Sequence, residues 1–303
     1  MKVYLSDRAA IGLAVAAFTL WVLTDTCMKL VGQSGLPAYE ILAFLGLFIA
    51  GFLLAHAGLT RGMRALWPRD TRRSLVRSLL DLGNNLCVVV ALRHLSLTLF
   101  YILVFLAPMV TALLGALFLR EHMSWRRAAA VLAGFAGVVI AVDPFGTARQ
   151  GDWIGYAACM VCVACFSANM VWSRVLTQTE PAESLTFFSG VVMAVFGFGL
   201  MLWHAAPLTP LLTTGLCAMG LFCALGSFFF FVALRHTTAA TVAQYHYTQL
   251  LTGALLAWLI WHTRPTLSMV LGAVLIVASG LYIAVTAPRS AIPAMSASGV
   301  ASD

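Results

Sequence analysis

The sequence predicts an all-α integral membrane protein of ten transmembrane helices, arranged as two inverted repeats of five helices each. Composition is the first reason: 61% of the 303 residues are hydrophobic and only 10% are charged, whereas soluble proteins average about 45–50% apolar and about 25% charged residues. The other two reasons are the length of the apolar runs and a set of short motifs that recur at a common offset. Each is taken in turn below.

The apolar runs are long enough to cross a bilayer, which takes about 20 residues of helix. Turn residues such as Asp143-Pro144 separate them. We expect spans at 9–30, 38–57, 74–94, 96–119, 125–142, 153–174, 183–203, 211–233, 238–261 and 267–286. The first run is too long to be the core of a signal peptide. Residues 288–303 have nothing to bury and are expected to form a disordered tail.

Basic residues indicate the orientation of these spans. With a cytoplasmic start, Arg93, Arg149 and Arg264 fall outside and Lys29 lies near the end of a span. The other fourteen of the eighteen bases fall inside: Lys2, Arg8, Arg61, Arg64, Arg69, Arg72, Arg73, Arg77, Arg120, Arg126, Arg127, Arg174, Arg235 and Arg289. Because cytoplasmic loops are enriched in Lys and Arg, we expect both termini in the cytoplasm. Bases spread over short loops predict contact with membrane lipid and no nucleic-acid partner.

Three short motifs recur in the same order with offsets of 142 or 143 residues. Residues 91–94 (ALRH) recur at 233–236, residues 140–142 (IAV) at 283–285, and Ile11-Gly12 at Ile154-Gly155. Five spans per copy is an odd number, so the second copy enters the membrane from the opposite side. We therefore predict a first repeat at 1–143, with spans one to five, and a second at 144–287, with spans six to ten.

The segments that follow resemble the EamA-type transporters of the drug/metabolite transporter superfamily. They are Phe105-Leu106-Ala107-Pro108 through Leu119-Arg120-Glu121, then 134–139 (GFAGVV), Gln244-Tyr245, 247–251 (YTQLL) and 279–282 (SGLY). The resemblance covers roughly residues 9–286. It implies a ten-helix permease that moves small organic metabolites across a bacterial inner membrane. Asp25, Lys29 and the motif in 238–261 are similar to the branch that includes riboflavin and S-adenosylmethionine carriers.

Two positions depart from the family pattern. The family often has an Arg eight residues after the Pro that opens the second span, whereas Pro37 is followed at that spacing by Leu45. The family's Glu after the fourth span is Glu121, but its counterpart after the ninth span is Thr263. Any role of the family's Arg after the second-span Pro is therefore absent here or moved to another position.

Asp25 and Lys29 are the first candidate site residues. They are four residues apart on one expected helix, which puts them on one face within pairing distance, and Trp21 lies one turn below. An ion inside a membrane usually faces a cavity and has a partner. We predict an ion pair that lines a cargo cavity. The alternative is that Lys29 snorkels to the outer surface and Asp25 fills an internal gap.

A polar stripe follows on the third span, where Arg77, Asp81, Asn84 and Asn85 recur at helical spacing. Such a stripe either packs against other helices or lines water, and we favour the cavity. Asn169 occupies the repeat position of Thr26, beside Asp25, so polar groups are expected at equivalent depths in both halves.

The ninth span is the most polar of the ten and supplies four further candidates: Gln244, Tyr245, His246 and Gln249. We expect them to offer hydrogen bonds and aromatic surface to an amphipathic cargo, while the largely apolar fourth span forms a wall. A lone histidine inside a membrane is more often packed than a proton carrier, so proton coupling at His246 is the alternative.

Other recurring residues are expected to serve packing. Cys159, Cys162 and Cys165 lie in one apolar run and fit small buried thiols better than cluster ligands. Glycines expected to allow close helix contacts are Gly134, Gly137, Gly253, Gly272 and Gly280.

The favoured function is a secondary, gradient-driven transporter that works by alternating access. The sequence contains no Walker loop, the motif that would indicate a nucleotide-driven pump. The alternatives are an intramembrane enzyme, for which no catalytic motif is found, and a channel, for which no charge ring or filter sequence is found. The expected cargo is an amino acid, a vitamin or a nucleoside-like compound. We expect no cofactor and no metal, and a homodimer is left open.

Overall fold

A computed structural model describes residues 7–60, 62, 66–118, 124–143, 152–176, 179–236 and 245–286. These residues form helices and connections, and no strand occurs among them. The predicted tail at 288–303 and Gln244 lie outside the described residues. The helices are α1 (Asp7–Gln33), α2 (Ala38–Thr60), α3 (Thr71–His94), α4 (Leu97–Val104), α5 (Ala107–Phe118), α6 (Trp125–Val142), α7 (Trp153–Leu176), α8 (Ala182–Met201), α9 (Pro210–His236), the 3-10 helix η2 (Tyr245–Tyr247), α11 (Thr248–Trp261) and α12 (Leu267–Val285).

Each predicted span contains helix, and the bounds of α6 are those expected from the sequence. Among the residues that the structure describes, six helices are long and apolar enough to cross a membrane: Ile11–Gln33, Ala38–Leu59, Thr71–His94, Trp153–Ser173, Glu183–Met201 and Pro210–Phe230. Leu97–Thr111, Ala128–Val142 and Leu267–Ile283 are shorter apolar helices. Helix is the expected form of such segments because in lipid a backbone must satisfy its own hydrogen bonds.

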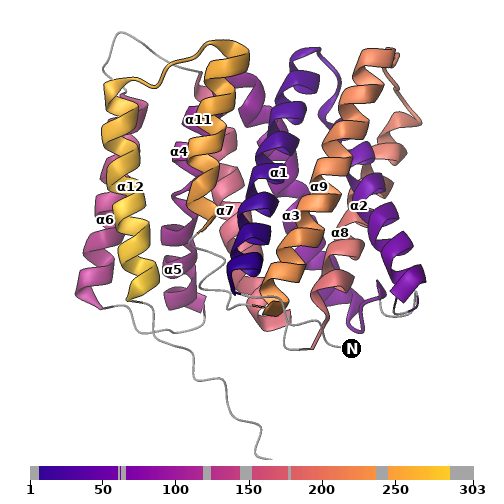
Figure 1. The fold of residues 1–303 in the computed structure, drawn as a ribbon, viewed down its shortest axis with the longest axis horizontal. Coiled ribbons are helices and arrows are strands. Elements are labelled where there is room, and N and C mark those ends of the chain that lie inside the picture. Colours follow the sequence, from indigo (N-terminus) through magenta and orange to yellow (C-terminus); the bar gives the residue numbers. More distant parts are fainter. Residues whose placement is uncertain are drawn as a thin grey trace, which may run out of the picture.

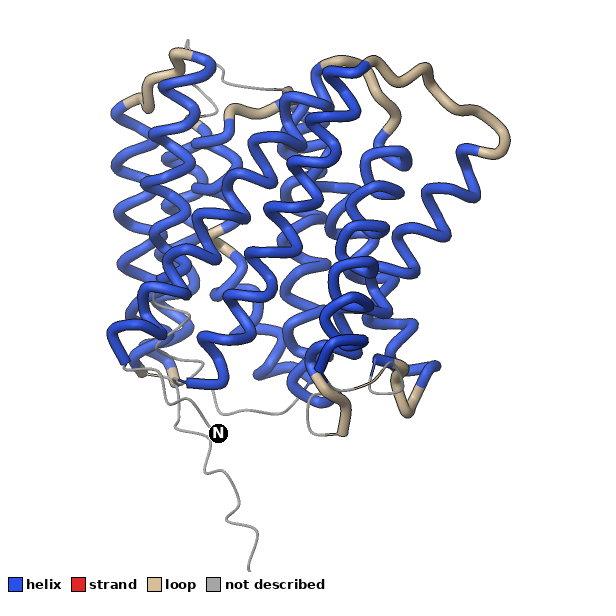
Figure 2. Tube along the Cα trace, turned by 45° about the vertical axis from the view of Figure 1, so that its right-hand side comes forward, coloured by secondary structure: helices blue, strands red, loops and turns tan. Residues whose placement is uncertain are grey.

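The helices run side by side between two faces of the bundle, as Figures 1 and 2 show from two directions. We call the face where α1 begins the lower face and the face where α1 ends the upper face. Turn chemistry sets several helix ends: Gly35, with φ of +86°, follows α1, and Pro37 precedes α2. At the lower face the Glu180 carboxylate accepts the N–H groups of Arg69 and Asp70, at 3.0 and 2.8 Å, just before α3.

The predicted fourth span is broken in the middle of the bundle into α4 and α5. Ser96 caps α4 by accepting the N–H of Leu99 at 3.2 Å. Pro108 explains the break, because its nitrogen has no hydrogen to donate to the carbonyl four residues earlier. The chain tightens there instead, with the N–H of Leu106 donating to Leu103 at 3.0 Å. The predicted ninth span is also irregular, since its described part begins with η2 before α11.

Four helix pairs make the most extensive contacts: α1 with α9, α3 with α7, α2 with α8, and α6 with α12. Glycine allows some of these helices to approach closely. A Cβ atom on Gly272 of α12 would meet the backbone of Gly137 in α6, and one on Gly253 of α11 would meet the ring of Tyr101 in α4. The expected packing role of these glycines is confirmed.

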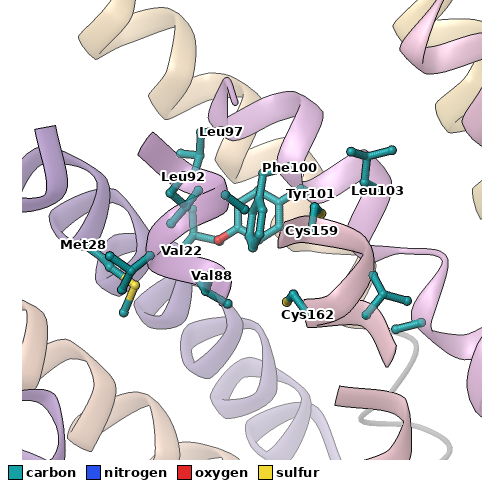
Figure 3. Packing of buried hydrophobic residues seen from close by; sticks show 14 of the residues in the cluster. Val22, Met28, Val88, Leu92, Leu97, Phe100, Tyr101, Leu103, Cys159 and Cys162 are labelled. Atoms are coloured by element: carbon teal, nitrogen blue, oxygen red, sulfur yellow. The ribbon is translucent and has the colours of Figure 1, made fainter. Parts of the chain in front are cut away.

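Large apolar side chains from most of the helices form the core. Figure 3 shows Tyr101 beside Phe100 and Cys159, with its hydroxyl oxygen pointing toward the helices that carry Val22 and Val88. Every residue from Leu97 to Leu103 is buried. The core therefore encloses α4 and brings the Tyr101 hydroxyl to α1.

Candidate functional site

Asp25 is held by a residue that the sequence analysis did not single out. The Tyr101 hydroxyl of α4 donates to the Asp25 carboxylate of α1 at 2.6 Å. Asp25 is only partly buried, although it lies deep within α1. Tyr101 is polar in an apolar run, which was the one sequence signal that could have identified it.

The predicted ion pair between Asp25 and Lys29 is wrong. Lys29 is 5% exposed and its ammonium donates to the backbone carbonyls of Leu92 and Leu95, where α3 ends. It also lies 5.5 Å from the ring centroid of Trp261 in α11. Carbonyls at a helix C-terminus lack intrahelical partners and carry a partial negative charge. These carbonyls therefore accept the hydrogen bonds of the Lys29 ammonium, which helical spacing had led us to pair with Asp25.

Asp81 belongs to a hydrogen-bonded network that joins α3 to α7. The Asn169 amide donates to the Asp81 carboxylate at 3.3 Å, and the Ser173 hydroxyl donates to the Asn169 oxygen at 3.2 Å. Two predicted site residues, Asp81 in the first half of the chain and Asn169 in the second half, are therefore in contact. Asn169 is 7% exposed, whereas Asp81 is only partly buried.

Arg77 extends this network toward α8. Its guanidinium donates to the Ser173 hydroxyl at 2.9 Å, to the Ser189 hydroxyl at 2.8 Å and to the Leu185 carbonyl at 3.0 Å. The Ser189 hydroxyl then donates to Ser78 at 3.2 Å. The polar stripe of α3 thus packs against other helices at its lower end, which is one of the two roles that the sequence left open.

Nearer the middle of α3, both asparagines are partly accessible. The Asn84 oxygen accepts the thiol of Cys162 in α7 at 3.2 Å, and the Asn85 amide donates to the Asp81 backbone carbonyl at 2.8 Å. Helix α1 packs against α3 and α9, and α3 packs against α7. Helices α1, α3, α7 and α9 therefore converge on one polar region inside the bundle.

Aromatic rings adjoin this region along α1 and α9. Trp21 lies 5.1 Å from Phe230 and 5.6 Å from Phe18 between ring centroids. The His246 ring lies 5.1 Å from Phe18 and 5.2 Å from Phe105. Phe18 is buried, whereas Trp21, Phe230 and His246 are partly accessible. A planar or cationic group would find ring faces here.

The ninth-span candidates divide by exposure. Tyr245 and His246 of η2 are partly accessible. Gln249 is 4% exposed, and its amide donates to the Phe18 carbonyl of α1 at 3.3 Å. Gln249 is therefore in contact with the α1 backbone, while Tyr245 and His246 have accessible surface for a ligand.

A separate polar contact lies at the upper face, outside the spans. The Asp152 carboxylate accepts the N–H of Gly155 at 3.0 Å and contacts His94 Nδ1 at 2.8 Å. The Gly155 N–H, with the His94 contact added, holds the pKa of the Asp152 carboxyl below its ordinary value of 3.8. The pair ties the start of α7 to the turn between α3 and α4.

Among the described residues, no group of three or more His, Cys, Asp or Glu side chains is arranged to hold a metal ion. The site combines carboxylates, amides and rings. These are the kinds of group that bind amphipathic organic molecules in proteins, by charge, hydrogen bonds and stacking.

Comparison with known proteins identifies the family of a chain with this fold and site. The sequence model of the EamA-like transporter family matches residues 8–142 and, a second time, residues 153–285. The chain belongs to this family. It is therefore a multi-pass membrane protein, as the apolar helices also indicate.

Named relatives of this EamA-like chain are transporters or exporters of small metabolites. A riboflavin transporter of Rhizobium johnstonii is 31% identical over 91% of this chain and 92% of its own. An S-adenosylmethionine uptake transporter of Rickettsia bellii is 24% identical over 86% and 87% of the two chains. A pseudopaline exporter of Pseudomonas aeruginosa is 27% identical over 92% and 97%. These names indicate transporters and not enzymes.

A solved crystal structure has the same fold as this EamA-like chain. The two superpose with a TM-score of 0.63 at 18% sequence identity, over 93% of this chain and 97% of the other. At this identity the similarity extends to the fold alone.

Proposed function

We propose that the protein is a secondary transporter of a small organic metabolite that works by alternating access and is driven by a gradient. The cargo class is an amino acid, a vitamin or a nucleoside-like compound, and the membrane is a bacterial inner membrane with both termini in the cytoplasm. The names of the relatives support the class of function. The mechanism rests on how the helices pair.

The pairing of helices is the observation that carries the mechanism. We propose that residues 1–143 and 144–287 are inverted repeats, in which α1 corresponds to α7, α3 to α9, α2 to α8 and α6 to α12. Exchanging the halves then turns the α1·α9 contact into the α7·α3 contact, and both are among the four most extensive. The same exchange swaps α2 with α8 and α6 with α12, so it leaves the α2·α8 and α6·α12 contacts unchanged. A transporter built in this way can open to either side by letting its halves exchange conformations.

The broken helices add support because discontinuous helices line the substrate sites of many transporters. The break between α4 and α5 lies beside Tyr101, and η2 carries Tyr245 and His246. Both irregular segments therefore adjoin the polar region around Asp25. We propose that this region, with Trp21, Asp81 and Asn84, is the cargo site.

Flux measurements on the full chain in proteoliposomes test this function. We expect uptake of labelled riboflavin or S-adenosylmethionine to saturate with concentration and to accelerate when unlabelled compound is trapped inside. That acceleration is the mark of a carrier that returns faster when loaded. Linear flux without acceleration would indicate a channel, and chemical conversion of the compound would indicate an enzyme.

Reporter fusions test the orientation separately. A reporter after Arg289 and another near Arg69 should both be cytoplasmic, and one near Arg149 should be external, because bases concentrate in cytoplasmic loops. A C-terminal reporter on the far side of the membrane would rule out the ten-span inverted repeat.

A further inference from the structure

Cations and carboxylates inside the bundle are kept apart. Lys29 and Arg93 donate to backbone carbonyls near the upper face, and Arg77 donates to hydroxyls and a carbonyl near the lower face. The ion pairs among the described residues, Arg73–Asp70 and His94–Asp152, lie at the faces. None of these cations is paired with a carboxylate inside the bundle.

Within the part of the chain that the structure describes, the side chains that donate to the Asp25 and Asp81 carboxylates are uncharged. Tyr101 donates to Asp25 and Asn169 donates to Asp81. A carboxylate in a medium of low dielectric constant is costly without a compensating charge. Because both residues are only partly buried, we infer that the missing charge comes from a ligand. The helices that carry the two carboxylates, α1 and α3, pack against each other.

The neighbouring rings suit the same kind of ligand. Trp21 is one helical turn from Asp25 on α1 and lies 5.1 Å from Phe230 of α9. An aromatic face attracts a cation and stacks on planar groups. A coupling proton on Asp25 would neutralise the carboxylate, whereas an organic cation would neutralise it and also contact the partly accessible surface of these rings, so we favour the cation.

We propose that the cargo carries a net positive charge, that its cationic group pairs with Asp25, and that its planar or apolar part lies against Trp21 and Phe230. The inference rests on the proposed transport function, because it concerns the ligand of that site. It narrows the cargo class to organic cations, including zwitterions with an added positive charge.

Two compounds of nearly the same shape test the charge requirement. S-adenosylmethionine carries a sulfonium, and S-adenosylhomocysteine has an uncharged thioether at the same place. Equilibrium binding to the purified full chain should favour S-adenosylmethionine by about tenfold or more, the effect of one close charge pair. Asp25→Asn should reduce this preference to less than about twofold.

Asp25→Asn retains an oxygen that can accept the Tyr101 hydroxyl, and thermal unfolding checks that the variant folds. Asp143→Asn is the matched control: it removes one carboxylate that is exposed at the end of α6. Asn also tolerates the left-handed backbone found there. The control should keep the wild-type preference.

Equal binding of the two compounds by the wild type overturns the inference, whether or not any variant folds. A folded Asp25→Asn that keeps the full preference also overturns it, and would assign Asp25 to a coupling proton. If either result were found together with saturable uptake, the transport function would be supported and the cationic cargo would be excluded. Selective binding with linear flux would instead overturn the transport function and leave the cation site.

Discussion

The fourth and ninth predicted spans are similar in chain path but differ in how far their side chains are exposed. Both are irregular near the middle of the bundle, and both lie beside α1 or its proposed counterpart α7. In α4 every residue from Leu97 to Leu103 is buried, whereas Tyr245 and His246 of η2 keep accessible surface. The similarity concerns the chain path and the difference concerns the side chains. A site between two similar halves can thus be chemically one-sided.

The contact between these two spans provides the largest expected effect. Gly253→Val should cost about 1–3 kcal/mol of stability, because a side chain there would meet the Tyr101 ring. Thermal unfolding in detergent measures it. Gly51→Val is the control, since a Cβ on Gly51 meets nothing within 4 Å. Equal stability of the two variants would mean that α4 and α11 do not pack as described.

Tyr101→Phe tests the one polar group that buried α4 contributes to the site. Removing the hydroxyl leaves the Asp25 carboxylate without its donor, and hydrogen bonds to charged groups contribute about 1.5–3 kcal/mol. We expect a lower unfolding midpoint and weaker cargo binding. Tyr282→Phe, on the exposed surface of α12, should change neither. Wild-type behaviour of Tyr101→Phe would exclude the Tyr101–Asp25 bond from the site.

Gln249→Leu and Tyr245→Leu separate packing from binding within the ninth span. Gln249 is buried against the Phe18 carbonyl, so its loss should lower stability by about 1 kcal/mol. Tyr245 is partly accessible, and its loss should weaken cargo binding while the unfolding midpoint stays near that of the wild type. Unfolding and binding are measured on both variants. The reverse pattern would reassign the two residues.

Asp152→Asn should have the smallest effect, because the residue is exposed and Asn caps helices about as well as Asp. It tests the tie between α7 and the turn that leads into α4. A carboxyl with a lowered pKa stabilises the fold above its ordinary value of 3.8, and this contribution is lost as the pH falls below that value. The midpoint difference between variant and wild type should therefore shrink in acid. A difference independent of pH would exclude the carboxylate as its source.

Sequence reasoning succeeded where the physical determinant was local. Apolar length and turn residues predicted helix in every span, and for α6 they predicted both ends, because hydrocarbon thickness and backbone hydrogen bonding act on consecutive residues. The break at Pro108 follows from the same kind of local rule, although the sequence analysis predicted one continuous span there.

The hydrogen-bond partners of polar side chains were harder to predict from the sequence, because they lie in segments that are distant along the chain. Helical spacing places Asp25 and Lys29 close together, but each side chain found a better neighbour more than sixty positions away in sequence: Tyr101 for the first and the end of α3 for the second. A single sequence does not state which helix ends lie beside one another. The contact of Asp81 with Asn169 was not predicted either, because the repeat offset related Asn169 to Thr26, beside Asp25, and gave it no partner on α3.

The separation of charge inside the bundle bears on membrane voltage. Each elementary charge that crosses the full potential changes the free energy by about 2.3 kcal/mol per 100 mV. Lys29 is bonded to backbone carbonyls, while Asp25 is bonded to a neutral hydroxyl. A cationic cargo balances the charge of the Asp25 carboxylate, so the loaded site carries one negative charge fewer than the empty site. The voltage then acts mainly on the return of the empty carrier, so an imposed potential should change the rate of net uptake more than the rate of one-for-one exchange.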